Sequence, residues 1–401
     1  MAERTPLHGR HLAAGARMVA FAGWEMPLQY TSVREEQGAV RTSAGLFDVS
    51  HMGRFDVLGA GAGAFLQHLT VNDLSRLLPG RAQYDLCCRP DGGIVDDLVV
   101  YRLERGWLVV GNAANRHKDL EWMRAHAPAG VDIVDRTDEL SLVALQGPMA
   151  LAMLPAKDGR LESLPRFGVT WATVAGVEAL VSRTGYTGED GFELFVAAGR
   201  AKQVWDALVE AGARPCGLAA RDVCRLEAGL RLYGSDMNET TNPYEVGLGW
   251  VVKLDKGPFV GRRALRRIRA RGPARTLVGL AAHGRTIPRP GAIVLREGRS
   301  IGSVTSGTYS FWLGAGIGMA LVEAGEAPIG AQVEFDLTGR RGSAEVVSLP
   351  FYRRAASSEA GRGASTGLGQ AVRPQPAAEA ASGITAEEDD RRGGALLHRD
   401  P

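Results

Sequence analysis

The chain has 401 residues, which is long for a single hydrophobic core and predicts two or three domains. Hydrophobic residues make up 45% and charged residues 23% of it, a balance typical of globular proteins. The net charge of +2 gives no indication of a nucleic-acid partner. No apolar run is long enough to cross a membrane and the N-terminus lacks a signal peptide, so we expect no membrane association and a cytoplasmic protein.

The first two thirds of the chain mix helical and extended patterns. In chain order the patterns predict strands within 44–58, a Gly-rich turn and a helix over 59–69, two strands within 80–112 around the turn RPDGG, a helix over 117–126, a strand over 140–147, strands within 175–197, a helix over 199–212 and a helix from 217.

The last third has a different character. From 275 onward, six short apolar segments alternate with Gly and Pro turns, which predicts a small antiparallel barrel or sandwich. A basic stretch at 261–275 precedes it, and we favour a solvated helix followed by a linker over a binding patch. Residues 355–401 contain no Phe, Trp or Tyr, so we expect a disordered tail.

Two motifs suggest cofactor or metal sites that their surroundings do not support. GAGAGA at 59–64 fits G-x-G-x-x-A, but no alternation of helices and parallel strands follows it, so a strand–helix turn is favoured over dinucleotide binding. The four cysteines form no CxxC and the eight histidines have no zinc-binding spacing. We therefore expect reduced buried thiols and no metal site.

The segment GGIVDDLVVYR, 92–102, reads as a strand that carries two adjacent acids. One acid can face a cavity while the other meets solvent or a hydrogen-bond partner. The alternative is an edge strand with both acids in water. Because strand side chains alternate, the two predicted faces are Val95, Asp97, Val99 and Tyr101 on one side, and Ile94, Asp96, Leu98 and Val100 on the other.

Two further positions each leave two interpretations open. Alternation within GFELFV places Glu193 on the face of Phe195, where it can accept hydrogen bonds from an amino-heterocycle or lie in solvent. In the helix from 217, Arg221 and Arg225 lie four residues apart on one face. Arg225 can clamp an anionic ligand group, or it can pair with Asp222 or Glu227 nearby.

Six stretches, taken together, resemble the T-protein family of the glycine cleavage system, whose members are tetrahydrofolate-dependent aminomethyltransferases. The stretches run in the family's order from about residue 5 to 354 and are FAGWEMPLQY, GLFDVSHMGRFDV, AQYDLCCRPDGGIVDDLVVYR, RTGYTGEDGFEL, RLEAGLRLYGSDMNETTNPYEVGLGWVVKLDKG and IGSVTSGTYS. One departure from the family's pattern is visible: TYSFWLGAG lacks the small residue and proline usual after the serine, and we expect this to alter a barrel loop near the cavity mouth.

The resemblance implies an α+β fold, a three-domain cloverleaf around a central folate cavity, with a small C-terminal antiparallel β-barrel. The implied domains are a discontinuous folate-binding domain over 1–52 and 140–270, an inserted α+β domain over 53–139, and the barrel over 275–354.

The resemblance also implies the site. Asp97 matches the family's key carboxylate, and we expect it to be the catalytic residue. The residues expected to bind folate are Met52, Tyr84, Tyr101, Asn112, Tyr186, Glu193, Arg225 and Arg353. Tetrahydrofolate would be a co-substrate, and the lipoylated H-protein would be the partner that carries the aminomethyl group.

In the implied reaction the methylene passes to tetrahydrofolate, giving 5,10-methylenetetrahydrofolate and ammonia. A fixed carboxylate at Asp97 would stabilise positive charge on the transferred carbon and orient the attacking nitrogen, and the question of a general-base role stays open. Two alternatives use the same cavity: a tetrahydrofolate-dependent demethylase of a small methylated amine or aromatic ether, and a folate-binding scaffold without catalysis.

Overall fold

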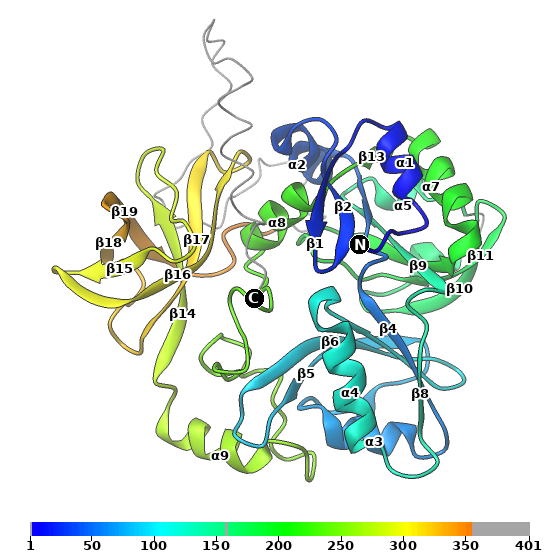
Figure 1. Cartoon of the computed structure of the whole chain (residues 1–401), viewed down its shortest axis with the longest axis horizontal. Helices are drawn as coiled ribbons and strands as arrows, with labels where there is room; N and C mark the ends of the chain where they lie inside the picture. The colour runs from blue at the N-terminus through cyan, green and yellow to red at the C-terminus, as the bar shows by residue number, and fades with distance from the viewer. Residues whose placement is uncertain (1, 157–158, 355–401) are drawn as a thin grey trace, which may run out of the picture.

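Three sheets meet around the middle of the molecule, and each belongs to a separate lobe (Figure 1). This computed structural model describes residues 2–156 and 159–354. A five-stranded sheet lies at the bottom of Figure 1, a six-stranded sheet at the upper right and a closed barrel at the left. The mixture of helices and strands and the closed barrel confirm the predicted fold class. The predicted tail, 355–401, lies outside the described residues.

The six-stranded sheet has the order β10-β11-β12-β9-β3-β13 and is antiparallel except between β13 and β3. Its strands are β3 (Gly45–Asp48), β9 (Leu140–Gln146), β10 (Val169–Val174), β11 (Val177–Ser182), β12 (Gly191–Ala197) and β13 (Arg214–Pro215). The helices of this lobe are α1 (His8–Ala13), α2 (Val33–Thr42), α5 (Ala150–Met153), α6 (Arg160–Ser163) and α7 (Ala201–Glu210).

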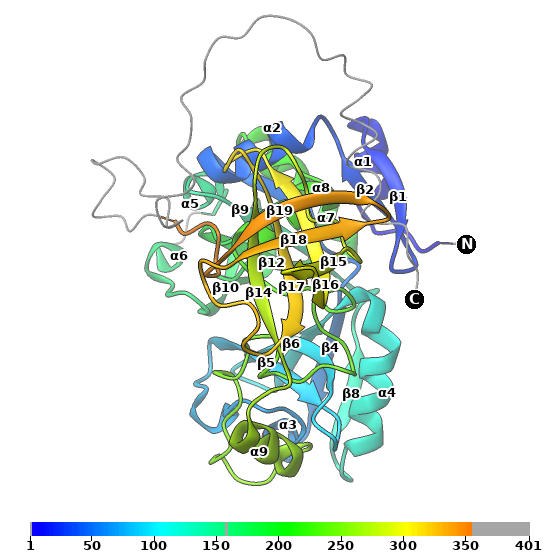
Figure 2. The same ribbon diagram turned by 90° about the vertical axis from the view of Figure 1, so that its left-hand side faces the viewer.

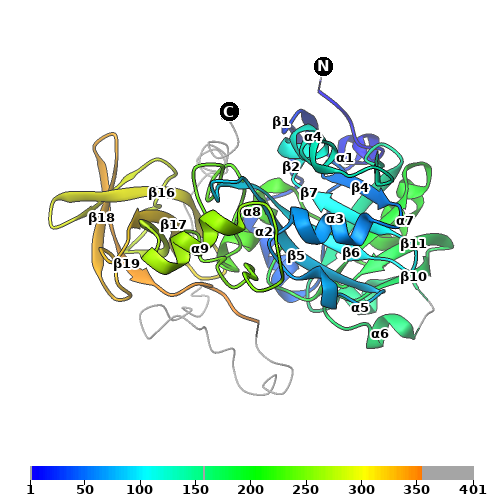
Figure 3. The same ribbon diagram turned by 90° about the horizontal axis from the view of Figure 1, so that it is seen from below.

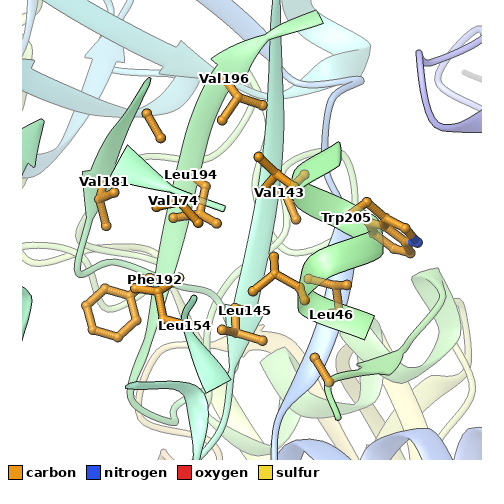
Figure 4. Packing of buried hydrophobic residues seen from close by; sticks show 14 of the residues in the cluster. Leu46, Val143, Leu145, Leu154, Val174, Val181, Phe192, Leu194, Val196 and Trp205 are labelled. Atoms are coloured by element: carbon orange, nitrogen blue, oxygen red, sulfur yellow. The ribbon is translucent and has the colours of Figure 1, made fainter. Parts of the chain in front are cut away.

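Alternation along β12 decides which side chains face the core and which face the site. Phe192, Leu194 and Val196 pack into one hydrophobic core together with Trp205 of α7 (Figure 4). Phe195 packs into a different cluster on the opposite face. The predicted pattern for this strand is confirmed, and Glu193 accordingly lies on the side away from the main core of this lobe.

The five-stranded sheet has the order β5-β6-β7-β4-β8. Its strands are β4 (Gly53–Leu58), β5 (Arg81–Cys88), β6 (Ile94–Arg102), β7 (Trp107–Gly111) and β8 (Asp132–Asp135), and α3 (Ala62–Leu69) and α4 (Arg116–His126) belong to the same lobe. The strand that carries the two acids, β6, pairs on both sides, with β5 and β7. The interpretation of an edge strand with two solvated acids is therefore wrong.

A bulge interrupts the pairing of β5 with β6. Cys87 pairs with Asp96 and Cys88 pairs with Ile94, so Val95 is an extra residue without a partner. Val95 packs in the same cluster as Leu98 and Val100. The prediction that Val95 shares a face with Asp97 is wrong, because the bulge breaks the alternation one residue before the two acids.

The connection between the lobes contains α8 (Leu218–Glu227), a long irregular segment over 228–261, and α9 (Arg262–Arg271). The helix α8 contacts α2, the strand β2 (Trp24–Gln29) and two barrel strands, so it lies where the lobes meet. β2 forms a two-stranded sheet with β1 (Arg17–Phe21). In α9, which faces the viewer in Figure 3, Ala264 and Leu265 are buried and most arginines are exposed, and this burial pattern confirms the predicted solvated helix.

Six antiparallel strands close into the C-terminal barrel, in the order β14-β17-β16-β15-β18-β19 (Figure 2). They are β14 (Arg275–Ala282), β15 (Ile293–Arg296), β16 (Arg299–Ser310), β17 (Ala315–Glu323), β18 (Gln332–Leu337) and β19 (Arg340–Val347). Each corresponds to one of the six apolar segments predicted from the sequence. The predicted barrel is confirmed, and the small interior is filled by side chains such as Leu280, Val294 and Phe335.

Some elements were not predicted. The segment 80–112 contains three strands rather than two, because the chain turns again at Gly106 and returns as β7. β10 and the elements before residue 44, among them the ten-residue α2, were also missed. Among the described residues, no helix is both long enough and apolar enough to span a membrane.

Candidate functional site

A cavity of about 2310 Å³ lies between the lobes and receives side chains from the sheets of all three lobes, from α8 and from the segment after it. Eight of the nine site residues predicted from the sequence line this cavity, and they are Met52, Tyr84, Asp97, Asn112, Tyr186, Glu193, Arg225 and Arg353. These residues lie up to 301 positions apart, from Met52 to Arg353, so the fold brings them together. The ninth, Tyr101, does not line the cavity.

Asp97 projects from β6 into the cavity and is held by two hydrogen bonds. The side-chain amide of Asn112 donates to Asp97 Oδ1 at 2.7 Å, and the Tyr84 hydroxyl donates to Oδ2 at 3.1 Å. Burial and the neighbouring Asp96 raise the pKa of Asp97 to about 7, although both hydrogen bonds lower it. The carboxyl group therefore changes its charge near neutral pH, which is the range in which a carboxylate can assist proton or charge movement.

Asp96 points away from the cavity and is fully buried. It accepts hydrogen bonds from the side-chain amides of Asn112 and Asn115, at 2.9 and 2.7 Å, and from the backbone N–H of Asn112 at 3.1 Å. Asn115 was not predicted from the sequence, although its position three residues after Asn112 was visible. The two adjacent acids thus have separate tasks: Asp97 faces the cavity, and Asp96 anchors the Asn112 amide that contacts both carboxylates.

The expectation that Tyr101 lines the cavity is wrong. Tyr101 is 1% exposed, packs edge-on against Phe195 with ring centroids 5.3 Å apart, and its hydroxyl contacts Ser182, Thr184 and Glu193. It lies on the same strand face as Asp97, but the six-stranded sheet covers that end of the strand. Tyr101 supports Glu193 from behind and does not itself face a ligand.

Glu193 is another carboxylate of the cavity and is 8% exposed. The Thr184 hydroxyl donates to Glu193 Oε2, and the Thr184 and Ser182 hydroxyl oxygens lie 2.9 Å apart, within hydrogen-bonding distance. This network fixes the direction of the carboxylate. Its accessible edge can accept hydrogen bonds from a ligand that carries amino or amide N–H groups.

Arg225 lines the cavity but its guanidinium is already bonded to protein groups. Nε donates to Asp222 at 2.8 Å, Nη1 donates to Asp236 at 2.7 Å, and Nη2 donates to the Ser306 hydroxyl at 2.9 Å. Of the two interpretations, pairing with Asp222 is confirmed, whereas Glu227 pairs with Arg41 instead. Arg225 joins α8 to the barrel and has little donor capacity left for an anionic ligand.

Arg221, one turn earlier on α8, has a guanidinium nitrogen that is free to donate a hydrogen bond to a ligand. Its guanidinium lies over the Tyr186 ring at 4.9 Å from the centroid, and no acceptor among the described residues reaches its buried Nη1. Burial lowers the pKa of Arg221, while the charge of Glu193 raises it. A buried, unpaired guanidinium at the cavity wall needs an acceptor from a ligand or from water.

Tyr186 and His51 complete the polar wall of the cavity. The Tyr186 hydroxyl donates to the backbone carbonyl of Arg231, which fixes the ring beneath Arg221. Burial lowers the pKa of His51 to about 4, so its ring is neutral at pH 7, and its buried Nδ1 has no partner among the described residues. The sequence pattern does not single out His51, and its place in the cavity follows only from the fold.

The barrel side of the cavity is basic at its rim. Arg340, Arg353 and Arg354 are exposed there, and Arg354 lies 3.5 Å from Asp190. The unusual loop after Ser310 lies next to this rim: Trp312 packs edge-on against Tyr352, which lines the cavity. The departure noted in the sequence therefore contacts the cavity wall indirectly.

The described residues contain no cluster of three or more His, Cys, Asp or Glu side chains that could hold a metal ion. All four cysteines are free and buried, which confirms the expected reduced thiols. The polar groups of the cavity thus include the Asp97 and Glu193 carboxylates, several hydroxyl and amide groups and a set of arginines. Such a set suits an organic ligand with N–H donors at one end and negative charge at the other.

Comparisons with known proteins cover nearly all of the described chain. Residues 7–256 match the GCVT N-terminal domain, and residues 275–353 match the glycine cleavage T-protein C-terminal barrel domain. The chain is 49% identical over 356 residues to an aminomethyltransferase of Herpetosiphon aurantiacus, covering 88% of this chain and 98% of the relative. It is also 49% identical over 363 residues to an aminomethyltransferase of Geobacillus kaustophilus, covering 88% of this chain and all of the relative.

One solved structure extends the similarity to three dimensions. The glycine cleavage system aminomethyltransferase T from Bartonella henselae superimposes with a TM-score of 0.80 at 34% sequence identity. The superposition covers 87% of this chain and 98% of that protein.

Proposed function

The chain belongs to the glycine cleavage T-protein family, and on this premise we propose that it is an aminomethyltransferase which passes the methylene of an aminomethyl group from lipoylated H-protein to tetrahydrofolate. The products are 5,10-methylenetetrahydrofolate, ammonia and the dihydrolipoyl form of the carrier. The observation that carries the proposal is the position of Asp97: a carboxylate fixed by Asn112 and Tyr84 faces a large central cavity.

The residues of the cavity fit a reduced folate. A pterin presents a row of amino and amide N–H groups and a carbonyl oxygen, which complement the Glu193 carboxylate and the unpaired Nη1 of Arg221. The exposed guanidinium of Arg353 at the rim complements the anionic glutamyl end of the same molecule. Tetrahydrofolate, when bound, supplies the nitrogen that accepts the transferred carbon.

Asp97 acts on the charge that develops during transfer. As the carbon leaves the sulfur of the carrier arm, positive charge grows on the aminomethyl group, and a fixed carboxylate nearby stabilises it without having to reorient. Asn112 and Tyr84 hold both oxygens in place, so little reorganisation is needed at the moment of reaction. With a pKa of about 7, Asp97 can also accept a proton from the attacking nitrogen.

The other residues around the cavity hold its ligand-binding groups in position. The Tyr101 hydroxyl and Thr184 hold Glu193, which orients the pterin edge, and Arg221 stacked on Tyr186 forms the adjacent wall. The neutral ring of His51 adds one more hydrogen-bonding group without adding charge. Together they position a ligand so that one nitrogen lies near Asp97.

The proposal is tested by ammonia release from aminomethylated H-protein, with and without tetrahydrofolate. We expect fast release that requires tetrahydrofolate and yields 5,10-methylenetetrahydrofolate in equal amount. A small methylated amine or an aromatic ether, supplied with tetrahydrofolate but without H-protein, serves as the control substrate. Turnover of that control in place of the protein-borne substrate would favour the demethylase, and binding of tetrahydrofolate without turnover of either would favour a scaffold.

A further inference from the structure

A third carboxyl group lies behind the two acids of β6. Asp119, in the first turn of α4, is 4% exposed and does not line the cavity. Its side chain is in hydrogen-bonding contact with Asp96. No donor among the described residues reaches Asp119 Oδ2. Nothing in the sequence pattern singled this residue out, and the proposed reaction does not use it directly.

Gly111 makes room for this contact. A Cβ atom at Gly111 would lie 2.6 Å from Asp119 Oδ2 and 3.5 Å from Asp96 Oδ2, so both carboxyl groups approach the same α-carbon. A contact of 2.6 Å excludes any larger residue unless a carboxyl group moves. The end of β7 is therefore shaped so that the two acids meet.

Two carboxyl groups that share a hydrogen bond need a proton between them. Asp96 accepts three hydrogen bonds from the donors on Asn112 and Asn115, which is the environment of a charged carboxylate. Asp119 receives no such donor on Oδ2. The proton consequently belongs to Asp119, which donates to Asp96, and burial together with Asp96 raises the pKa of Asp119 well above its usual range.

The other titratable groups around Asp119 do not change this assignment. They are Lys118 on α4, Cys87 on β5, Tyr233 on the connecting segment, and Asp97 on β6. The Lys118 ammonium is engaged elsewhere, since it donates to the Val95 carbonyl at 2.7 Å and to the Tyr233 hydroxyl at 2.9 Å. Cys87 is buried and its pKa is raised, so its thiol is neutral.

From this geometry we infer that Asp119 is a positioning residue: it holds a proton in a hydrogen bond to Asp96, and through Asp96 it fixes the Asn112 amide that binds Asp97. The chain of contacts runs from Asp119 through Asp96 and Asn112 to Asp97. The proton on Asp119 keeps a single negative charge on the Asp96–Asp119 pair. If both were ionised, their repulsion would separate them and release Asn112.

The test compares Asp119→Asn with Asp119→Leu. Asparagine fills the same space and donates an N–H to Asp96 as the proton of Asp119 does, so we expect kcat within about threefold of the wild type. Leucine fills the space but donates nothing, so we expect kcat to fall about tenfold to hundredfold, while KM for tetrahydrofolate stays nearly unchanged. Glu121→Gln, an exposed acid two residues later on the same helix, is the matched control and should change nothing.

An infrared measurement tests the proton itself. At about pH 8.5, where Asp97 with its pKa of about 7 is ionised, the difference spectrum between the wild type and Asp119→Asn should contain the band of one protonated carboxyl group. The Glu121→Gln difference spectrum should lack it. The activity comparison rests on the proposed function, but the infrared band does not, so a missing band overturns this inference even if the enzyme is an aminomethyltransferase.

Three results contradict the inference. Asp119→Leu as active as the wild type would mean that Asp119 only fills space. Asp119→Asn as impaired as Asp119→Leu, or unable to fold, would mean that a negative charge is needed there. Absence of the carboxyl band would mean that Asp119 is ionised in the folded protein.

Discussion

Arg221 and Arg225 lie one helical turn apart on α8, but their guanidinium groups have different hydrogen-bond partners. Arg225 donates to Asp222, Asp236 and Ser306, whereas Arg221 stacks on Tyr186 and leaves a buried Nη1 without an acceptor. Both side chains line the cavity. The two arginines therefore have different roles, and substitutions at the two positions should have opposite consequences for binding and stability.

Arg221→Met should weaken tetrahydrofolate binding by about tenfold to hundredfold, because it removes a charge-assisted hydrogen bond to the ligand. The melting temperature should stay the same or rise, since a buried, unpaired charge is lost. Titration of the folded variant with tetrahydrofolate and a thermal melt measure the two effects. Unchanged affinity would show that Arg221 makes no productive contact with the ligand.

Arg225→Met should instead destabilise the protein. It leaves Asp236, which is 1% exposed, without its cationic partner, and a broken buried ion pair typically costs about 3–5 kcal/mol. Thermal denaturation measures the loss. If Arg225→Met melted like the wild type but failed to bind tetrahydrofolate, Arg225 would be the ligand-binding arginine after all.

Asp97→Asn should lower kcat by about a hundredfold or more while changing tetrahydrofolate affinity by less than about threefold, because the neutral amide cannot stabilise positive charge in the transition state. The change keeps the shape of the side chain, and its neighbours Asn112 and Tyr84 can still contact it. Single-turnover kinetics and an equilibrium titration separate the two quantities. Equal losses in both would indicate that Asp97 contributes to binding and not to the chemical step.

The pH dependence should report the ionisation of Asp97. Because its pKa is raised to about 7, the carboxylate is present above that value and is lost as the pH falls through it. We expect kcat/KM to decline below about pH 7, approaching a tenfold loss per pH unit. A profile that stays flat down to pH 5, about two units below that pKa, would mean that a charged Asp97 is not required.

Tyr84→Phe tests whether the acidic limb of the pH profile, the decline below about pH 7, reports the ionisation of Asp97. The Tyr84 hydroxyl donates to Asp97 and lowers its pKa, so removing the hydroxyl should raise the pKa and move the acidic limb to higher pH. Tyr309→Phe, in the barrel and outside the cavity lining, is the matched control. A shift of the acidic limb in both variants, or in neither, would show that this limb does not report the ionisation of Asp97.

Much of the fold could be predicted from the sequence because its patterns are local. The six barrel strands alternate with Gly and Pro turns, and GFELFV alternates in a way that determines which side chains enter the core. The direction of Asp97 relative to Asp96 also followed from alternation. The position of Val95 did not, because a bulge depends on the register with β5 and not on the composition of β6.

The detailed site could be predicted less well, since it depends on contacts between distant segments. Tyr101 shares a strand face with Asp97, but β11 and β12 cover it. The donors of Arg225 are bound by Asp236 in an irregular segment and by Ser306 in the barrel. No helical spacing within α8 distinguishes Arg225 from Arg221, so the packing of the irregular segment and of the barrel against α8 decides which arginine is free.

The same packing gives a prediction about stability away from the cavity. Glu227 is fully buried on α8 and does not line the cavity. Its Oε2 accepts from Arg41 of α2 at 3.0 and 2.6 Å, and its Oε1 accepts from Gln37 of α2 and from Ser310 of β16. One carboxylate therefore joins α2, α8 and the barrel, and it compensates the charge of a guanidinium that is itself inaccessible to solvent.

Glu227→Ala should lower the melting temperature by about 5 °C or more, because breaking a buried pair while its partner stays charged costs about 3–5 kcal/mol. Among the residues that the structure describes, Arg41 would keep Glu189, at 2.8 Å, as its charged partner. Tetrahydrofolate affinity of the folded protein should be unchanged, since Glu227 lies outside the cavity. Glu323→Gln is the control: it breaks the exposed pair with Arg299 and should leave the melting temperature nearly unchanged. If both variants melted alike, the buried pair would not be what joins α8 to the barrel.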